Sequence, residues 1–321
     1  MFDWSHQRTL VLGASGFCGT HLCAALQERG ARVVAFDRAP LPFESPKILF
    51  ERGDLLDLPL LRSLLERHEV DVVFHLAAQP IVSTSIEYPI ETMQDNIVGT
   101  YNVCEAIRLS SNRPRLVFAS SGAVYGATNA TRALSEDEPF LAASNIYAPT
   151  KAAADGAVRC YAQVYGLRAA TCRWMNTYGP GDLNFSRVVP ATLRRAQAGK
   201  PGLISATDGT NVLELLHVRD MIEAYLRVAE LLDRPEVRGE AFNFGGGKPL
   251  VLREVVADIT RAWNEATGQN VAVQPEICGP RVQSVKYLDI SKAKRVLDWQ
   301  PRIGLEEGLR ETAAWYARFW R

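Results

Sequence analysis

What the sequence lacks already narrows the class of protein. It has no run of about 18 apolar residues, so no segment is expected to cross a membrane as a helix. Its 36 basic side chains are balanced by 36 acidic ones, which leaves no positive excess for binding nucleic acid. The chain does not open with a basic segment followed by an apolar core, so no secretory signal is expected.

The cysteines and histidines are too scattered to form a recognisable metal or disulfide framework. The six cysteines include no CxxC pair, and the five histidines do not cluster. We therefore expect no metal, no disulfides, and reduced thiols in a cytoplasmic protein.

What the sequence does have is a regular alternation of short apolar runs with longer helical patterns. Strands are expected at 9–12, 32–36, 70–76, 115–119 and 167–173, and helices at 16–29, 57–68, 91–110 and 147–165. This spacing predicts an α/β fold of the Rossmann type, in which helices cover both faces of a doubly wound parallel sheet.

The alternation weakens after residue 177. Shorter helices are expected near 187–199, 219–232, 251–266 and 304–319, with turn residues between them. We expect an NAD-binding domain over 1–177, completed by returning segments near 210–245. The remainder, 178–321, is expected to form mainly a smaller, interleaved C-terminal α/β lobe that binds the substrate.

A glycine-rich loop between the first strand and the first helix predicts a dinucleotide site. Gly13, Gly16 and Gly19 permit a tight turn, a close approach of the backbone to a pyrophosphate, and close packing of helix on strand. Asp37 ends the second strand, where a carboxylate can accept from ribose hydroxyls and disfavours a 2′-phosphate. NAD is therefore expected rather than NADP, although Arg38 follows and has the opposite tendency.

Further cofactor contacts are expected around this loop. Asp54 and Leu55 can meet the adenine amine, although Asp54 equally reads as a helix cap. The remaining expected contacts are Phe17, Leu76, Ala77, Ala78, Ser120, Tyr147 and Lys151.

Tyr147 and Lys151 form a YxxxK pair at the start of a helix and share one face of it. A phenol titrates near pH 10, but a neighbouring ammonium and a positive nicotinamide would lower its pKa and make it a usable base. Ser121 follows a strand at the sheet edge where ligands bind, and it would hold a substrate oxygen near Tyr147. The alternative for Ser121 is a turn hydroxyl.

Together with Asn96-x-x-Gly99-Thr100 and the segment 173–181, these motifs resemble the extended short-chain dehydrogenase/reductase family. Within it they resemble the nucleotide-sugar epimerases and dehydratases. The resemblance implies that Tyr147 takes the proton from a sugar hydroxyl, usually at C4, while NAD takes the hydride. A 4-keto sugar results.

The residues after Ser121 distinguish the possible outcomes. Dehydratases resembling this chain carry an acid pair there, and here the positions hold Gly122 and Ala123. This favours an NAD-dependent nucleotide-sugar 4-epimerase. The alternatives are a reductase or dehydrogenase, or a 4,6-dehydratase, since 77–82, 184–187 and 286–289 resemble the CDP-glucose and GDP-mannose 4,6-dehydratases.

The resemblance also implies a nucleotide-sugar substrate and a homodimer formed through helices 92–109 and 147–165. Two arginines that usually hold the diphosphate are replaced by Leu213 and Gly279. Arg187 and Arg281 are candidates to replace them, because a guanidinium suits a pyrophosphate. The expected substrate contacts are Gln79, Ser121, Asn176, Arg187 and Arg281.

Overall fold

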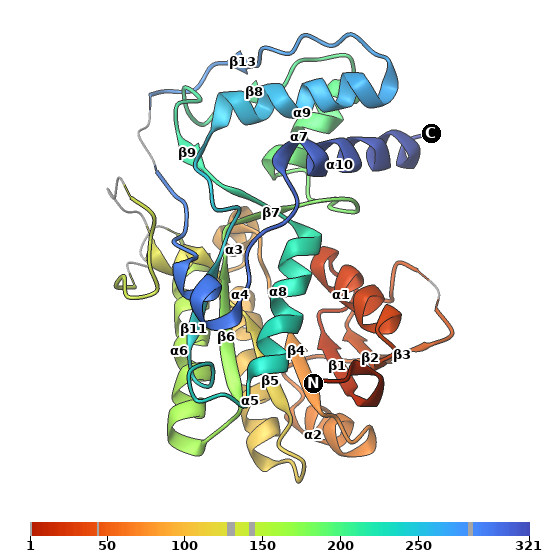
Figure 1. Ribbon diagram of the computed structural model, residues 1–321, viewed down its shortest axis with the longest axis vertical. Coiled ribbons are helices and arrows are strands. Elements are labelled where there is room, and N and C mark those ends of the chain that lie inside the picture. The colour runs from red at the N-terminus through yellow and green to blue at the C-terminus, as the bar shows by residue number, and fades with distance from the viewer. Residues whose placement is uncertain (1, 44, 127–131, 141–144, 282–284) are drawn as a thin grey trace.

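Seven parallel strands form the central sheet, in the order β3-β2-β1-β4-β5-β6-β11 (Figure 1). The computed structural model describes residues 2–43, 45–126, 132–140, 145–281 and 285–321. The strands of the sheet are β1 (Arg8–Leu12), β2 (Arg32–Asp37), β3 (Ile48–Arg52), β4 (Val72–His75), β5 (Arg115–Ala119), β6 (Ala169–Trp174) and β11 (Ala241–Phe244). The strand order reverses between β1 and β4, and ligands of such sheets bind in the crevice at that point.

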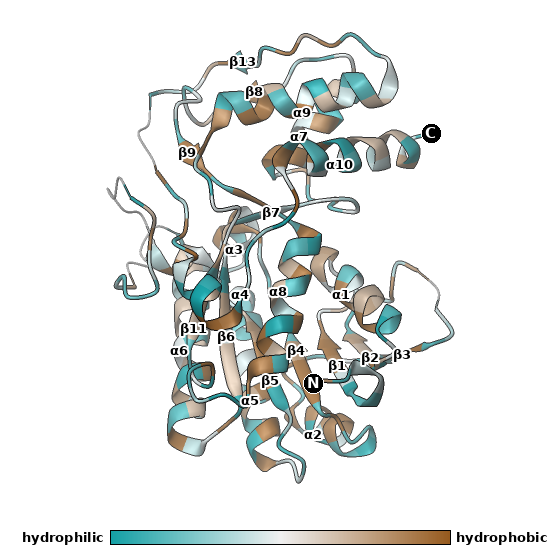
Figure 2. Ribbon diagram, in the orientation of Figure 1, coloured by the Kyte–Doolittle hydropathy of each residue, from teal (hydrophilic) through white to brown (hydrophobic). Residues whose placement is uncertain are grey.

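Helices cover both faces of the sheet, which confirms the expected doubly wound α/β fold. Along β1, Leu10 and Leu12 pack on one side and Val11 on the other, because successive side chains of a strand alternate. One layer contains α1 (Phe17–Glu28) and α8 (Val218–Leu231), and the other contains α2 (Leu58–Arg67), α5 (Gly99–Leu109) and α6 (Tyr147–Tyr165). In Figure 2 the central strands are largely brown, whereas helices such as α2 and α9 alternate brown and teal.

Two strands of the sheet were not expected from the sequence. Strand β3 pairs with β2 at one edge, and β11 pairs with β6 at the other. Strand β11 comes more than sixty residues after β6, and its four residues are all buried. The sheet is thus completed by a segment from the second half of the chain.

The helix expected over 91–110 is interrupted by a π-helical turn. It divides into α4 (Pro89–Met93), the turn η2 (Gln94–Val98) and α5. The side chain of Asn96 explains the turn, because its amide donates to Gln79 O at 3.1 Å and to Thr150 Oγ1 at 2.9 Å. Such turns often lie at functional sites.

The C-terminal half builds a second, smaller core. Helices α7 (Val188–Gln197), α9 (Leu252–Thr267) and α10 (Leu305–Phe319) pack together around Trp263 and Tyr316, at the top of Figure 1. Short strands pair beside them: β7 (Asn176–Tyr178) with β10 (Leu215–His217), β9 (Val212–Leu213) with β12 (Leu250–Val251), and β8 (Leu203–Ile204) with β13 (Glu276–Ile277). The turn η4 (Ala293–Leu297) instead packs into the core beside α1 and α8. Within the described ranges, no helix combines the length and apolarity needed to cross a bilayer.

Candidate active site

Two adjoining cavities lie at the carboxyl ends of the strands. The first measures about 250 Å³ and is lined by the glycine loop, by Asp37 and Asp54, and by residues 76–78. The second measures about 680 Å³ and is lined by Ser121, Tyr147 and Lys151. Residues common to both linings are Cys18, Leu76, Ala78, Pro80 and Arg187. The two cavities therefore adjoin at these five residues.

The three positions of the loop hold glycine for different structural reasons. Gly13 has φ +85°, and a Cβ there would lie 2.5 Å from Ala77 N. A Cβ on Gly19 would collide with Gly13 O and lie 2.7 Å from Ala14 Cα. At Gly16 the nearest atom would be 3.4 Å away, an ordinary contact. Gly13 and Gly19 are thus required by the loop itself, and Gly16 leaves the cavity wall bare at the start of α1, where a pyrophosphate fits.

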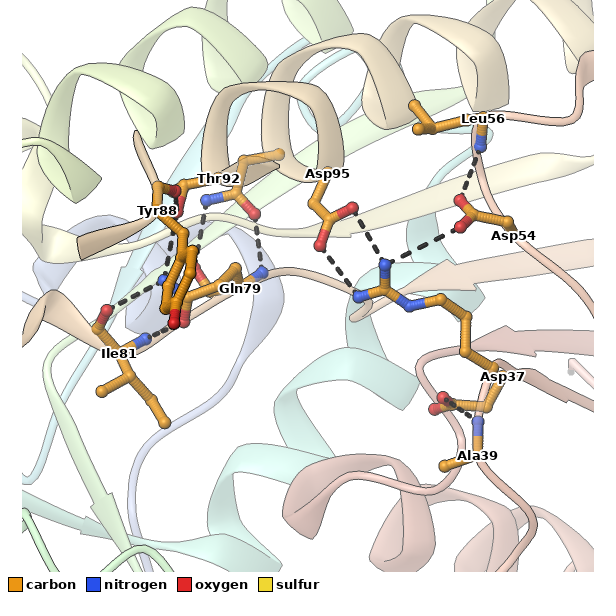
Figure 3. Close-up of polar contacts among 11 residues, drawn as sticks. Asp37, Ala39, Asp54, Leu56, Gln79, Ile81, Tyr88, Thr92 and Asp95 are labelled. Carbon is orange, nitrogen blue, oxygen red and sulfur yellow. Dashed lines mark hydrogen bonds and ion pairs between the residues drawn. The ribbon is translucent and has the colours of Figure 1, made fainter. Parts of the chain in front are cut away.

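The carboxylate of Asp37 lies in the first cavity, as expected for a ribose ligand. Its Oδ2 accepts from Ser15 N at 3.0 Å, and its remaining lone pairs can accept further bonds. Arg38 is held by Asp95 through two hydrogen bonds, at 2.8 and 3.2 Å, and its Nη1 lies 3.7 Å from Asp54 Oδ2 (Figure 3). Its charge is therefore matched by two carboxylates. The carboxylates of this cavity can accept hydrogen bonds from ribose hydroxyls, so the cavity fits a dinucleotide without a 2′-phosphate.

The expected catalytic residues come together in the second cavity. Tyr147 is the first residue of α6, and Lys151 lies one turn further along. Ser121 precedes the 3₁₀ turn η3 (Gly122–Tyr125), and its Oγ accepts from Ala123 N at 3.1 Å. Ser121 lies near enough to Tyr147 to lower the pKa of the phenol, against the effect of burial. Ser121 thus acts in the turn and also faces the phenol, so its two interpretations are compatible.

Burial decides the protonation of Tyr147 and Lys151. It raises the pKa of Tyr147, against the opposing effects of Ser121 and the charge of Arg187. Burial also lowers the pKa of Lys151 to about 8, and Lys151 Nζ donates to Ala119 O at 2.6 Å. The protein's own groups therefore keep the phenol protonated at neutral pH. The lowered phenol pKa expected from the sequence is not produced by these groups.

A buried ion pair that sequence reasoning missed fixes the helix carrying these residues. Asp155 lies one turn beyond Lys151, and its Oδ1 is 3.0 Å from Arg173 Nη2, with both side chains 0% exposed. Ser120 Oγ donates to Asp155 Oδ2 at 2.6 Å, and Arg173 Nη1 donates to Tyr125 OH at 2.9 Å. The charge of Asp155 also raises the pKa of Lys151 against the effect of burial. The i, i+4 spacing from Lys151 was the available signal for Asp155.

Two of the predicted substrate residues line the second cavity with Ser121. Asn176 lies in β7, and its Nδ2 donates to Glu214 O at 3.2 Å. Arg187 Nη1 lies 3.0 Å from Asp182 Oδ1, and Arg187 lines both cavities. Arg187 therefore lies where the two cavities adjoin.

The other two predicted substrate residues lie elsewhere. Gln79 Nε2 donates to Ile81 O at 2.9 Å and its Oε1 accepts from Ile81 N at 2.7 Å (Figure 3), so the amide already has partners. Neither Gln79 nor Arg281 is among the described residues that line the two cavities. The departure at Gly279 also has a steric reason, because a Cβ there would collide with the backbone of Thr207.

The second cavity is also notable for the chemistry it does not contain. Among its described lining residues there is no Asp, Glu or His. A Cβ on Gly122 would lie 2.8 Å from both Sδ and Cε of Met175, so this methionine fills the space beside the turn. Residues 1, 44, 127–131, 141–144 and 282–284 lie outside the described residues, and Glu44 is the one acidic residue among them.

The fold and the site define a family. Residues 9–245 match the model of the NAD dependent epimerase/dehydratase family, and the chain belongs to that family. The match covers the sheet, both cavities and the YxxxK pair. It confirms the resemblance drawn from the motifs and the expected cofactor, since NAD is the cofactor of the family.

The relatives include more than one activity. The chain is 33% identical to a UDP-glucose 4-epimerase of Mycolicibacterium smegmatis, over 96% of this chain and 98% of the relative. It is 32% identical to a dTDP-glucose 4,6-dehydratase of Xanthomonas campestris pv. campestris, over 96% and 92%. The structure of MoeE5 in complex with UDP-glucose and NAD superposes with a TM-score of 0.84 at 31% identity, over 98% and 100%. The chain spans about half (47%) of a trifunctional UDP-glucose 4,6-dehydratase of Arabidopsis thaliana, at 30% identity.

Proposed function

We propose that this protein is an NAD-dependent nucleotide-sugar 4-epimerase that acts through a transient 4-keto sugar. Epimerases and dehydratases share the first step, the oxidation of a sugar hydroxyl. They differ in what the protein can do to the keto sugar afterwards. The proposal therefore depends on the groups that reach the rest of the sugar ring.

The observation that carries the proposal is the absence of a carboxylate from the described lining of the second cavity. Elimination of water across C5 and C6 requires a base for the C5 proton and an acid for the C6 hydroxyl. The space beside Gly122 is taken by Met175, whose thioether can do neither. The thiol of Cys18 does not replace them, because burial raises its pKa to about 12 and keeps it protonated.

Tyr147 and its neighbours suffice for oxidation and its reversal. When bound, NAD supplies the acceptor and donor of the hydride and a positive ring charge near the phenol. Tyr147 takes the hydroxyl proton and later returns it, while Ser121 holds the same sugar oxygen. Lys151 stabilises the phenolate through its charge, which its pKa of about 8 preserves at neutral pH. Epimerisation then requires that the keto sugar turn its other face, and the 680 Å³ cavity offers room for this.

The diphosphate of the substrate is assigned to Arg187. This is the guanidinium that lines the second cavity among the described residues, and Leu213 lines the wall where the resemblance expects another arginine. Asn176 lies in the same wall. Arg281 lies outside the described lining, and its part in binding stays a prediction.

The experiment is a panel of UDP-, GDP-, CDP- and dTDP-sugars incubated with the purified protein in D₂O, followed by mass spectrometry and NMR. A 4-epimerase returns an isomer whose carbon-bound hydrogens come from the substrate, so the product contains no carbon-bound deuterium. Loss of one water with deuterium at C5 would make the protein a dehydratase. A net change in the redox state of added NAD would indicate a dehydrogenase or reductase.

Tyr147→Phe supplies the test of the assigned base. It removes one oxygen from a partly buried ring, and we expect no isomer from it but unchanged NAD binding. Tyr101→Phe, a matched change on an exposed ring of α5, should leave turnover unaffected. Turnover that persists in Tyr147→Phe would contradict the mechanism.

We also propose a homodimer formed through the outer layer of helices. The exposed apolar residues of α5 and α6 include Val98, next to the start of α5, and Tyr101, Val164 and Tyr165. Contiguous exposed apolar surface of this kind is typical of interfaces. Val164→Glu should shift the mass measured by light scattering toward a monomer, whereas Leu49→Glu, a matched change on the edge strand β3, should not.

A cytoplasmic location is proposed on the state of the thiols. All six cysteines lie within the described residues, and each is free. Unpaired cysteines are usual in a reducing compartment. Fractionation of the cells that make the protein would test this.

A further inference from the structure

An exposed arginine is anchored across the first cavity by a carboxylate from the opposite wall. Arg38 follows β2, and Asp95 lies in the π-helical turn η2. Both line the cavity together with Asp37 and Asp54, so the pair lies beside the wall assigned to the adenosine of the cofactor. The guanidinium bonds both oxygens of Asp95 and approaches Asp54 (Figure 3).

We propose that the Arg38–Asp95 ion pair is a latch on the adenosine half of the cofactor site. It slows the release of NAD, and it keeps Arg38 from serving as a ligand for a 2′-phosphate. Asp95 is thus a residue that determines both cofactor retention and cofactor specificity, although it lies more than fifty residues from Asp37 in the sequence.

The two halves of the latch differ in mobility. Asp95 is 15% exposed, and its neighbour Asn96 is fixed because Oδ1 accepts from Gln79 N at 2.8 Å and Nδ2 donates to Thr150 Oγ1. Arg38 is 61% exposed, and the described contacts of its guanidinium are with the two carboxylates. A fixed carboxylate and an exposed, flexible arm allow opening without any change in the sheet.

The charges explain the specificity. Arginine next to an acidic residue at the end of the second strand could pair with a 2′-phosphate, since a guanidinium binds phosphate in a bidentate manner. Here the edge formed by its two terminal nitrogens already donates to both oxygens of Asp95. A 2′-phosphate would have to displace that carboxylate while lying beside Asp37 and Asp54, which repel it.

The test measures cofactor binding without any sugar, so its outcome is independent of the proposed epimerase activity. The protein is loaded with NADH, and release is followed as the loss of energy transfer from tryptophan to NADH after a chase with excess NAD. Arg38→Gln and Asp95→Asn should each release NADH about fivefold faster than the wild type, the effect of losing one ion pair of this exposure. The double variant should be no faster than either single variant, because the same interaction is removed.

Specificity separates the two variants. Asp95→Asn frees Arg38 and should tighten NADPH binding several-fold, whereas Arg38→Gln should not. Arg310→Gln and Asp258→Asn serve as controls, because they break ion pairs on α10 and α9 whose arginines are about as exposed as Arg38. If Asp95→Asn destabilises the fold, Arg38→Lys replaces it in the test, since it keeps the charge but loses the two-pronged contact and should give an intermediate rate. The proposal would be overturned if Arg38→Gln released NADH at the wild-type rate, whether or not Asp95→Asn released it faster.

Discussion

Two alanine substitutions in the glycine loop should separate the stability of the fold from the binding of the cofactor. The methyl group of Gly19→Ala would collide with Gly13 O and press on Ala14 Cα at 2.7 Å, and both are backbone atoms of the same tight turn. The methyl group of Gly16→Ala would meet no atom closer than 3.4 Å. The two changes add the same atom three residues apart, so each is the control for the other.

Gly19→Ala should have the larger effect on stability, and Gly16→Ala the larger effect on NAD binding. Overpacking typically costs up to about 3 kcal/mol, and Gly19→Ala should reach that value because the backbone cannot withdraw. For a protein of this size, that loss lowers Tm by about 5 °C. Gly16 is the N-cap of α1, where alanine is slightly worse than glycine, so Gly16→Ala should cost about 1 kcal/mol or less. Its methyl group, however, enters the wall where a pyrophosphate lies and should weaken NAD binding about tenfold or more.

Thermal unfolding without cofactor and calorimetric titration with NAD measure the two effects independently. Gly19→Ala should lower the Tm measured without cofactor, whereas Gly16→Ala should keep its Tm but bind NAD poorly. Equal loss of Tm in both variants would refute the steric reading of the loop. Unchanged NAD affinity in Gly16→Ala would refute the assignment of this wall to the pyrophosphate.

Three further results are expected. Burial raises the pKa of Glu214 to about 8 from an ordinary 4.5, so the stability that this carboxyl contributes is complete below about pH 4.5 and is lost as the pH rises through 8. Glu214→Gln should therefore become more stable than the wild type between pH 5 and 9, by on the order of 4 kcal/mol at most. A difference in Tm that grows with pH would measure this. Asp155→Asn leaves Arg173 buried and unpaired and should cost about 3–5 kcal/mol of unfolding free energy in urea titrations. Because the pKa of Lys151 is about 8, the rate at saturating substrate should fall as the pH rises above 8, and a rate that keeps rising there would contradict its role.

Local chemistry explains why much of the site could be predicted. The glycine loop, Asp37 and the YxxxK pair each combine residue types with a spacing along one turn or one strand end. Such patterns fix where side chains lie relative to one another before any tertiary contact is known. The helix expected over 147–165 therefore begins and ends at the residues observed, and Tyr147 and Lys151 share the predicted cavity.

Contacts between distant segments explain what could not be predicted. Strand β11 is defined by its pairing with β6, and the sequence of its four residues does not indicate that they pair with β6. The turn η2 depends on the amide of Asn96 bonding Gln79 and Thr150. Gln79 was expected to contact the substrate, but its side-chain amide forms hydrogen bonds with the backbone of Ile81. The bonds that fix β11 and η2 join groups that the sequence keeps apart, whereas Gln79 bonds a residue only two positions away.

The preference for epimerisation over dehydration rests on both kinds of information, since Gly122 and Ala123 are read from the sequence and the position of Met175 only from the structure. Relatives of both activities are about equally similar to the chain, so the fold and the cofactor site do not separate them. The proposed 4-epimerase activity rests on Gly122, the first residue of η3, and on Met175, which follows β6 and whose Sδ and Cε would lie 2.8 Å from a Cβ at position 122. An acid at position 122 would have to displace that methionine, so the two positions are coupled. We therefore expect an acid at position 122 to require that the flexible end of Met175 move aside, or that position 175 change with it.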